Sequence, residues 1–354
     1  MSNKTPKIEL RTSPHTYAGA SVEQIMRNVV YALLPLCIYG VYLFGLSALA
    51  LLAVTTASCL LTEVFFNGLA GRANTLRDWS AVITGLLLAL TLPPSLPLWM
   101  AAVSGFIAIA LGKVLFGGLG FNVFNPALIG RAFIQAAFPV AITTWTPALA
   151  PQRFMEFIPS SLAWPFMQAP AVAEWSKSAV DSFTGATPLG LSKFESIGTD
   201  SMSLFAGTTA GSLGETSAVL ILVCGLYLAA RRMLDWRIPV AVMLGTVIVA
   251  SMFHFADADK YPSPWFMLFS GGLMLGAWFM ATDMVGSPVT PLGVWIYGLL
   301  IGFLTVIIRL FGGLPEGVMY AILLANAASP LIDQLTQPRV YGERPVKSRG
   351  ETRP

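Results

Sequence analysis

The residues most able to carry chemistry lie in one short polar stretch, DSFTGATPLG, at residues 181–190. This stretch belongs to the only long non-hydrophobic segment of an otherwise apolar chain. It offers the hydroxyl groups of Ser182, Thr184 and Thr187, and a hydroxyl is the group that a phosphoester requires. The sequence reveals no pairing of a nucleophile with a general base. The stretch therefore predicts an attachment point rather than a site of hydrolysis or group transfer.

Metal and thiol chemistry are not indicated. The chain has three cysteines and two histidines. Cys37, Cys59 and Cys224 each stand alone within a hydrophobic run, without the spacing of zinc or iron–sulfur ligands. We interpret them as small buried apolar residues. We predict no metal site, and any electron chemistry requires a bound organic cofactor.

Several ionisable side chains lie within or at the edges of apolar segments, where charge is costly and usually functional. Three have long stems that can reach the interface from positions near segment ends, and we expect these to be anchors: Arg27, Lys113 and Arg309. Glu63, Arg131 and Asp283 are the stronger functional candidates.

The composition places the chain in a bilayer. It is 55% hydrophobic and 11% charged, with a mean hydropathy of +0.69, whereas soluble domains carry roughly 25% charged residues. A membrane span needs about 20 apolar residues, and about ten segments approach that length. They are residues 25–46, 47–69, 79–92, 96–116, 126–145, 215–233, 237–255, 264–281, 293–311 and 316–332.

The segments predict an all-α integral membrane protein in four parts. Residues 1–145 form a first membrane half with spans 1–5, and residues 214–335 form a second half with spans 6–10. Residues 146–213 form the loop that joins them, and residues 336–354 form a tail.

Basic residues predict the orientation. With a cytoplasmic N-terminus, the inside segments hold most of them: Arg72, Arg77, Arg231, Arg232, Arg237 and the tail residues Arg339, Arg344, Lys347, Arg349 and Arg353. The short outside loops hold only Lys260. This positive-inside pattern places both termini in the cytoplasm and the long loop on the outer face, which is the periplasm in a Gram-negative bacterium. We expect Trp145 and Trp164 of that loop to lie at headgroup level.

Internal similarity predicts two inverted repeats of five helices. TGLLL at residues 84–88 is similar to GGLML at 271–275, and KVLFGGL at 113–119 is similar to RLFGGL at 309–314. Five spans separate the members of each pair, and an odd number inverts the second copy. Inverted repeats with short or broken helices are typical of transporters, and the plan is similar to that of urea transporters.

The glycine-rich run at residues 117–125 precedes a helix start. Asparagine is a favoured N-cap residue and proline a favoured first helical residue, so Asn125 and Pro126 predict a helix start. The run allows close backbone approach and could present amides to an anion or a flavin ring. Ordinary punctuation of a helix end is the competing interpretation.

DSFTGAT at residues 181–187 resembles the acceptor motif of the flavin transferase that joins FMN to proteins by a phosphoester bond. The motif reads Asp-x-x-Ser/Thr-Gly-Ala-Ser/Thr. The resemblance implies FMN on Thr187 and makes Asp181, Thr184, Gly185 and Ala186 the rest of the flavinylation motif. Gly185 and Ala186 are small, so another enzyme's active site can close over them.

Two further stretches resemble signature sequences of one family, FNVFNPALIGRAF at residues 121–133 and SGGLMLGAWFMATD at residues 270–283. The family comprises the D subunit of the Rnf ion-translocating electron-transport complex and the B subunit of the sodium-pumping NADH:quinone reductase. The resemblance covers nearly the whole chain, and its length and short N-terminal tail are more similar to the Rnf D subunit. Met284 stands where the family pattern leads us to expect proline.

The resemblance implies a subunit of the bacterial inner membrane that relays electrons through FMN on Thr187. The complex would couple NADH–ferredoxin electron transfer to translocation of Na+ or H+. The implied partners are the other subunits, including a second covalent-flavin subunit and iron–sulfur subunits, the flavin transferase, and membrane lipid, but no nucleic acid. The resemblance also implies a second, non-covalent flavin such as riboflavin. Residues 117–131, and in particular Asn125 and Arg131 together with Asp283, are the candidates for that flavin or for an ion path.

Two other functions remain open at this point. One is a channel or secondary transporter of the urea- or ammonium-channel type, because a fold does not determine a function. The other is a structural scaffold for redox subunits. Neither requires a flavin on Thr187.

Overall fold

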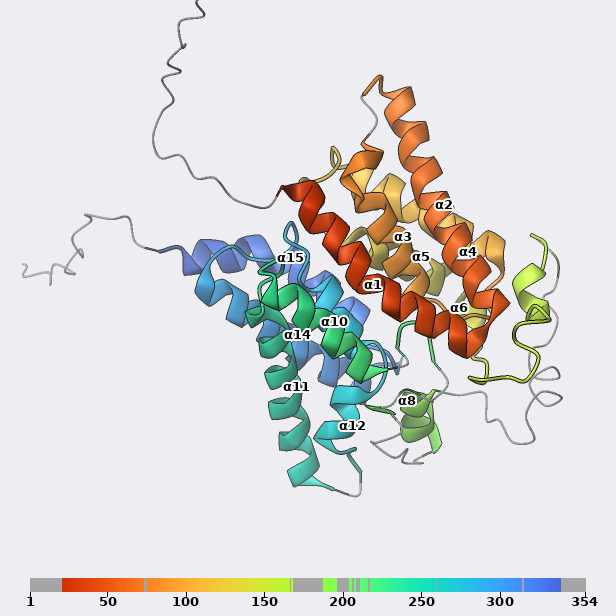
Figure 1. Ribbon diagram of the computed structural model, residues 1–354. Helices are drawn as coiled ribbons and strands as arrows, with labels where there is room; N and C mark the ends of the chain where they lie inside the picture. Colours follow the sequence, from red (N-terminus) through yellow and green to blue (C-terminus); the bar gives the residue numbers. More distant parts are fainter. Residues whose placement is uncertain are drawn as a thin grey trace, which may run out of the picture.

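The computed structural model describes residues 21–72, 75–165, 167, 187–195, 204–205, 207, 211–215, 217–258, 260–313 and 315–338. Within these ranges the regular secondary structure is helical throughout (Figure 1). Five of these helices are long and apolar enough to cross a membrane: α1 (Val22–Phe44), α2 (Leu46–Leu69), α11 (Arg237–Ala256), α14 (Pro291–Phe311) and α15 (Val318–Thr336). The chain is a multi-pass membrane protein.

Other apolar segments form shorter helices. They are α3 (Ser80–Thr91), α4 (Leu98–Ile109) with the π-helical turn η2 (Ala110–Val114), and α10 (Ala218–Ala230). The short apolar segment predicted at residues 79–92 forms α3, which ends at Thr91, shortly before Pro93 and Pro94. Proline lacks the N–H that would continue the hydrogen-bond pattern of a helix.

Two predicted spans are divided in the structure. Residues 126–145 form α5 (Pro126–Ala137) and the short α6 (Pro139–Ile142), separated at the residue before a proline. Residues 264–281 form α12 (Pro264–Phe269), α13 (Leu273–Leu275) and the π-helical turn η5 (Gly276–Met280). Gly271 has φ +61°, a left-handed conformation that glycine adopts without strain, so the chain turns there and restarts.

The loop after α6 folds back onto the turn between α1 and α2. Leu149 N donates to Leu43 O at 2.9 Å, and Leu46 N donates to Arg153 O at 2.9 Å. This packing buries Trp145 against the protein, with 8% exposure. Trp164 is 74% exposed.

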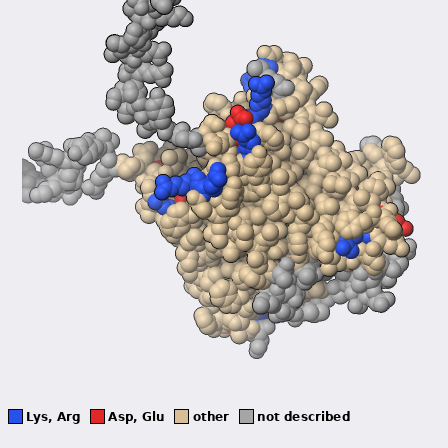
Figure 2. All heavy atoms as spheres, in the orientation of Figure 1, with Lys and Arg blue, Asp and Glu red and all other residues tan. Residues whose placement is uncertain are grey.

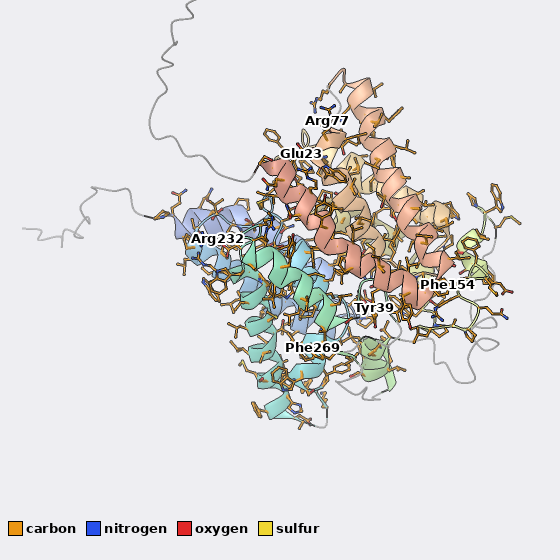
Figure 3. The ribbon with its side chains drawn as sticks, in the orientation of Figure 1. Glu23, Tyr39, Arg77, Phe154, Arg232 and Phe269 are labelled. Atoms are coloured by element: carbon orange, nitrogen blue, oxygen red, sulfur yellow. The ribbon has the colours of Figure 1, made fainter. Side chains whose placement is uncertain are left out.

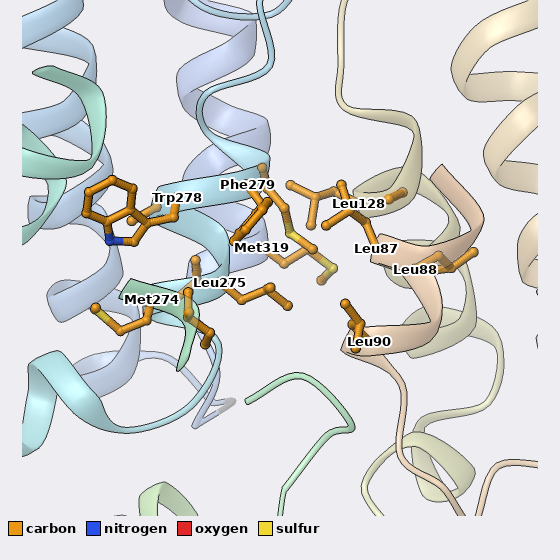
Figure 4. Close-up of a cluster of buried hydrophobic side chains, with 14 of the residues drawn as sticks. Leu87, Leu88, Leu90, Leu128, Met274, Leu275, Trp278, Phe279 and Met319 are labelled. Atoms are coloured by element: carbon orange, nitrogen blue, oxygen red, sulfur yellow. The ribbon is translucent and has the colours of Figure 1, made fainter. Parts of the chain in front are cut away.

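One hydrophobic core joins the two halves of the chain. Leu87, Leu88, Leu90 and Leu128 come from the first half, and they pack in the same cluster as residues of the second half (Figure 4). The latter are Met274, Leu275, Trp278, Phe279 and Met319. The backbone reinforces this junction, because Gly214 N donates to Leu90 O at 2.7 Å.

The helices of the two halves make corresponding contacts. In the first half α2 packs on α3 and α4, and α4 packs on α5. In the second half α11 packs on α12 and α14, and α14 packs on α15. Charge is confined to a few places on the face shown in Figure 2, and a wide uncharged surface lies between them.

Candidate functional site

Thr187 begins the short helix α8 (Pro188–Gly190) as its N-cap. Its Oγ1 accepts a hydrogen bond from Gly190 N at 3.2 Å, and the residue is buried, with 6% exposure. Asp181, Thr184, Gly185 and Ala186 lie outside the described residues. The hydroxyl of Thr187 therefore has a fixed position at the start of a helical turn.

The segment that follows Thr187 is docked on the second half of the protein. Leu189 packs with Leu204 and Phe266. In the π-helical turn η4 (Leu191–Glu195), Lys193 Nζ donates to Arg309 O at 2.8 Å and also to Gly312 O. These carbonyls end α14, where the helix dipole favours a cation.

Arg309 supports the broken helix on which this segment rests. Its guanidinium donates to Met267 O at 2.6 Å and to Ser270 O at 2.9 Å. Backbone groups released by a helix break at membrane depth must find such partners. Arg309 is only 3% exposed, so its expected role as an interfacial anchor is wrong.

A buried group of charges lies beside Thr187. A cavity with about 10 Å³ of water-accessible space, enough for about one water molecule, is lined by Thr187, Glu215, Gly271 and Glu316 among others. Arg131 of α5 pairs with both carboxylates, at 3.5 Å from Glu215 Oε1 and in direct contact with Glu316. The cavity is thus a junction of the two halves.

Gly272 leaves room for the buried carboxylate of Glu215, and that carboxylate in turn affects the pKa of Glu316. A Cβ at Gly272 would lie 2.7 Å from Glu215 Oε1, so a larger residue would displace that carboxylate. Burial, reinforced by the nearby charge of Glu215, raises the pKa of Glu316 to about 7 despite the opposing influence of Arg131 and Arg309.

A larger cavity lies at the N-terminal end of α5, with about 110 Å³ of water-accessible space, against about 10 Å³ for the cavity beside Thr187. Its lining combines aromatic and polar side chains, including Ser80, Thr84, Lys113, Asn122, Asn125, Trp278, Phe279, Thr282 and Asp283. The indole Nε1 of Trp278 is buried and has no hydrogen-bond partner within the described structure. The aromatic side chains of Trp278 and Phe279 give the cavity planar apolar surfaces that suit a flat ligand.

Two asparagines join the halves at this cavity. Asn125 Nδ2 donates to Met280 O at 3.2 Å, and Asn122 Nδ2 lies 3.4 Å from Asp283 Oδ2. The predicted helix start is confirmed, because Asn125 Oδ1 accepts from Ala127 N at 3.0 Å. Asp283 Oδ1 also accepts from Val285 N at 3.3 Å, which fixes the turn that follows.

Lys113 and Glu63 form a buried pair at the edge of this cavity. Lys113 Nζ lies 2.7 Å from Glu63 Oε1 and 2.5 Å from Ser80 Oγ, and Thr75 Oγ1 also contacts Glu63. Lys113 is 4% exposed, so the expected anchor role is wrong for this residue too. The carboxylate of Glu63, a functional candidate from the sequence, is held in an ion pair with Lys113.

The structure separates the three residues proposed for a second flavin or ion path. Asn125 and Asp283 line the larger cavity, whereas Arg131 lies beside Thr187. Six residues of α5, about 9 Å of helix axis, separate Asn125 from Arg131. One helix therefore connects the two sites.

Glu215 and Glu316 were not identified as site residues from the sequence. Each is a single carboxylate directly before an apolar segment, and that signal was available. The three cysteines are buried and free, as predicted. No cluster of three potential metal ligands occurs in the part of the chain that the structure describes.

Known proteins are similar to this sequence over nearly its whole length. Residues 9–342 match the model of the NQR2, RnfD, RnfE family. The D subunit of the proton-translocating ferredoxin:NAD(+) oxidoreductase complex of Clostridium ljungdahlii is 41% identical, over 95% of this chain and 96% of its own length. The D subunit of the Na(+)-translocating ferredoxin:NAD(+) oxidoreductase complex of Acetobacterium woodii is 40% identical, over 96% and 97%. The D subunit of the ion-translocating oxidoreductase complex of Stutzerimonas stutzeri is 40% identical, over 91% and 93%.

Proposed function

The chain belongs to the NQR2, RnfD, RnfE family, and on that premise we propose that it is the D subunit of an Rnf-type complex. The complex couples electron transfer between ferredoxin and NAD to ion translocation. The observation that carries this proposal is the near-full-length similarity to relatives with that name. Its partners are the other subunits of the complex, including a second covalent-flavin subunit and iron–sulfur subunits.

The proposal includes FMN joined to Thr187 by a phosphoester, attached by a flavin transferase. The flavin supplies one- or two-electron transfer when bound. Thr187 provides the required hydroxyl, and Leu189 and Lys193 hold its segment against α12 and α14. The cavity beside Thr187 accommodates about one water, so it suits the attachment oxygen and not the ring system.

A second, non-covalent flavin is proposed for the larger cavity. The planar side chain of Trp278 in the lining of this cavity supports the proposal, because a flavin ring is flat and aromatic. Phe279 offers an apolar contact, and Asn122 and Asp283 offer polar ones. In this arrangement the cavity for the second flavin and the cavity beside Thr187 lie near different turns of α5.

We further propose two inverted five-helix repeats in the bacterial inner membrane, with cytoplasmic termini and a periplasmic flavin loop. The contacts that α2, α4 and α5 make with one another correspond to those among α11, α14 and α15, and this correspondence supports the repeat. Arg77 and Arg232 lie toward the same end of the protein as Glu23, at the start of α1, whereas Phe269 lies away from that end (Figure 3). This polarity supports the orientation.

The flavin assignment is tested on a denaturing gel of the chain produced together with the flavin transferase. Wild type and Ser182→Ala are expected to fluoresce under ultraviolet light, and Thr187→Ala is expected to lose that fluorescence. Ser182→Ala is the matched control, because it removes a hydroxyl from a variable position of the same motif. A non-fluorescent wild-type band would support the channel or transporter alternative instead.

The translocated ion requires its own measurement. Two of the relatives given above have names that specify different ions, a proton and Na+. The dependence of ion transport by the assembled complex on sodium concentration distinguishes them. Transport that persists without sodium identifies the proton as the coupling ion.

A further inference from the structure

Glu316 is set apart from the other buried charges by its position. It lies in the loop between α14 and α15, its side chain is 17% exposed, and it lines the same cavity as Thr187. Glu215, the other carboxylate of the cavity, has a side chain that is only 4% exposed. Glu316 is therefore buried enough to respond to nearby charge and open enough to exchange a proton with water.

Among the residues that the structure describes, the formal charges around this cavity balance. Arg131 from α5 and Arg309 from α14 are positive, and Glu215 and Glu316 are negative. Among the described residues, Tyr320 of α15 also interacts electrostatically with Arg131, and Lys193 binds the backbone carbonyl of Arg309. Arg309 is already engaged with two backbone carbonyls, so the two carboxylates depend mainly on Arg131. Any additional negative charge at Thr187 leaves the group with a net charge of minus one, in surroundings of low dielectric constant where the cost is high.

We propose that Glu316 is a proton-binding site coupled to negative charge at Thr187. The step is a single protonation, in which water gives one proton to a carboxylate oxygen of Glu316 and no other bond changes. The redox consequence rests on the proposed flavin at Thr187. One electron that a one-electron donor adds to that flavin favours uptake of one proton by Glu316, and that proton returns to water when the electron leaves.

Geometry and acidity agree on this role. A carboxylate whose pKa is already near neutrality changes its protonation with small changes in local charge. Glu316 lines the same cavity as Thr187, so its protonation limits the negative charge that accumulates there.

The test replaces the flavin by a fixed charge, so that it does not depend on flavinylation. Thr187→Asp adds a carboxylate and Thr187→Asn is its neutral counterpart, and both residues are good N-caps, so α8 keeps its start. The purified full-length chain, with its glutamate carboxyl groups labelled with ¹³C, is titrated by infrared spectroscopy. The label separates glutamate bands from that of the introduced aspartate.

We expect one glutamate to titrate near neutral pH, and to disappear from the spectrum in Glu316→Gln but not in Glu156→Gln, an exposed control. Its proton affinity is expected to be at least threefold higher in Thr187→Asp than in Thr187→Asn. Equal affinities in these two variants would overturn the coupling, even if Glu316→Gln fails to fold. A missing flavin in the wild-type chain overturns the proposed function and leaves this comparison readable.

Discussion

The guanidinium of Arg131 contacts the carboxylate of Glu316, 185 residues later in the chain. This contact joins α5 of the first half to the loop between α14 and α15 of the second. Together with Glu215 it places a charged junction beside Thr187. The attachment point and the junction between halves are thus one location.

Arg131→Gln is expected to destabilise the protein by about 3–5 kcal/mol, because it leaves buried carboxylates without their cation. Thermal unfolding in detergent measures the change. Arg77→Gln, an exposed arginine, is the matched control and is expected to change stability by less than about 0.5 kcal/mol. Similar stability losses in the two variants would contradict the structural role of Arg131.

Lys193→Gln is expected to loosen the segment that follows Thr187. It removes a charge-assisted interaction with the last carbonyls of α14, worth about 1.5 kcal/mol or more. Hydrogen–deuterium exchange of residues 188–195 is expected to accelerate about tenfold, since that is the factor for roughly 1.4 kcal/mol. Lys260→Gln, an exposed lysine, serves as the control. Unchanged exchange in Lys193→Gln would mean that other contacts hold the segment.

Lys113→Met is expected to cost more stability than the double substitution Lys113→Met with Glu63→Gln. The single variant leaves the buried carboxylate of Glu63 without its cation, whereas the double variant removes both charges. Thermal unfolding of the two singles and the double gives the coupling energy between the residues. Additive losses would show that the pair does not act as a unit.

The stability of the protein is expected to depend on the ionisation of Glu316. Folding raises the pKa of this group from an ordinary value of 4.5 to about 7, so the folded state binds the proton more tightly. The resulting stabilisation is present below pH 4.5 and is lost as the pH rises through 7, by at most about 3 kcal/mol. Thermal unfolding between pH 5 and 8 is expected to show a smaller fall in Glu316→Gln than in wild type. Parallel curves for the two proteins would contradict the shift.

Phe279→Leu is expected to weaken a non-covalent flavin in the larger cavity several-fold, because it removes an aromatic contact worth about 0.5–1.5 kcal/mol. The measurement is the flavin released on denaturation, compared with the flavin retained on the chain. Trp236→Phe changes an exposed tryptophan and is the control. Retained flavin on Thr187 is expected to stay constant in both variants.

Much of the architecture could be predicted from local sequence. Hydrophobic segments predicted the helices, Asn125 and Pro126 predicted the start of α5, and Pro93 and Pro94 agreed with the end of α3. The isolated cysteines predicted buried apolar residues, which the structure confirms. These features depend on neighbours within a few residues, so spacing and residue type were sufficient.

The sequence by itself determined the membrane class, the family resemblance and the candidate role of Thr187, because each depends on composition or on a short motif. Only the tertiary structure decided which partners the buried charged side chains contact. Lys113 and Arg309 have stems long enough to reach either an interface or a buried partner, and their partners are remote or arise from a helix break. Arg131 likewise finds Glu215 and Glu316 at separations of 84 and 185 residues. A buried charge is stable only where folding brings a partner to it, and no local pattern contains that information.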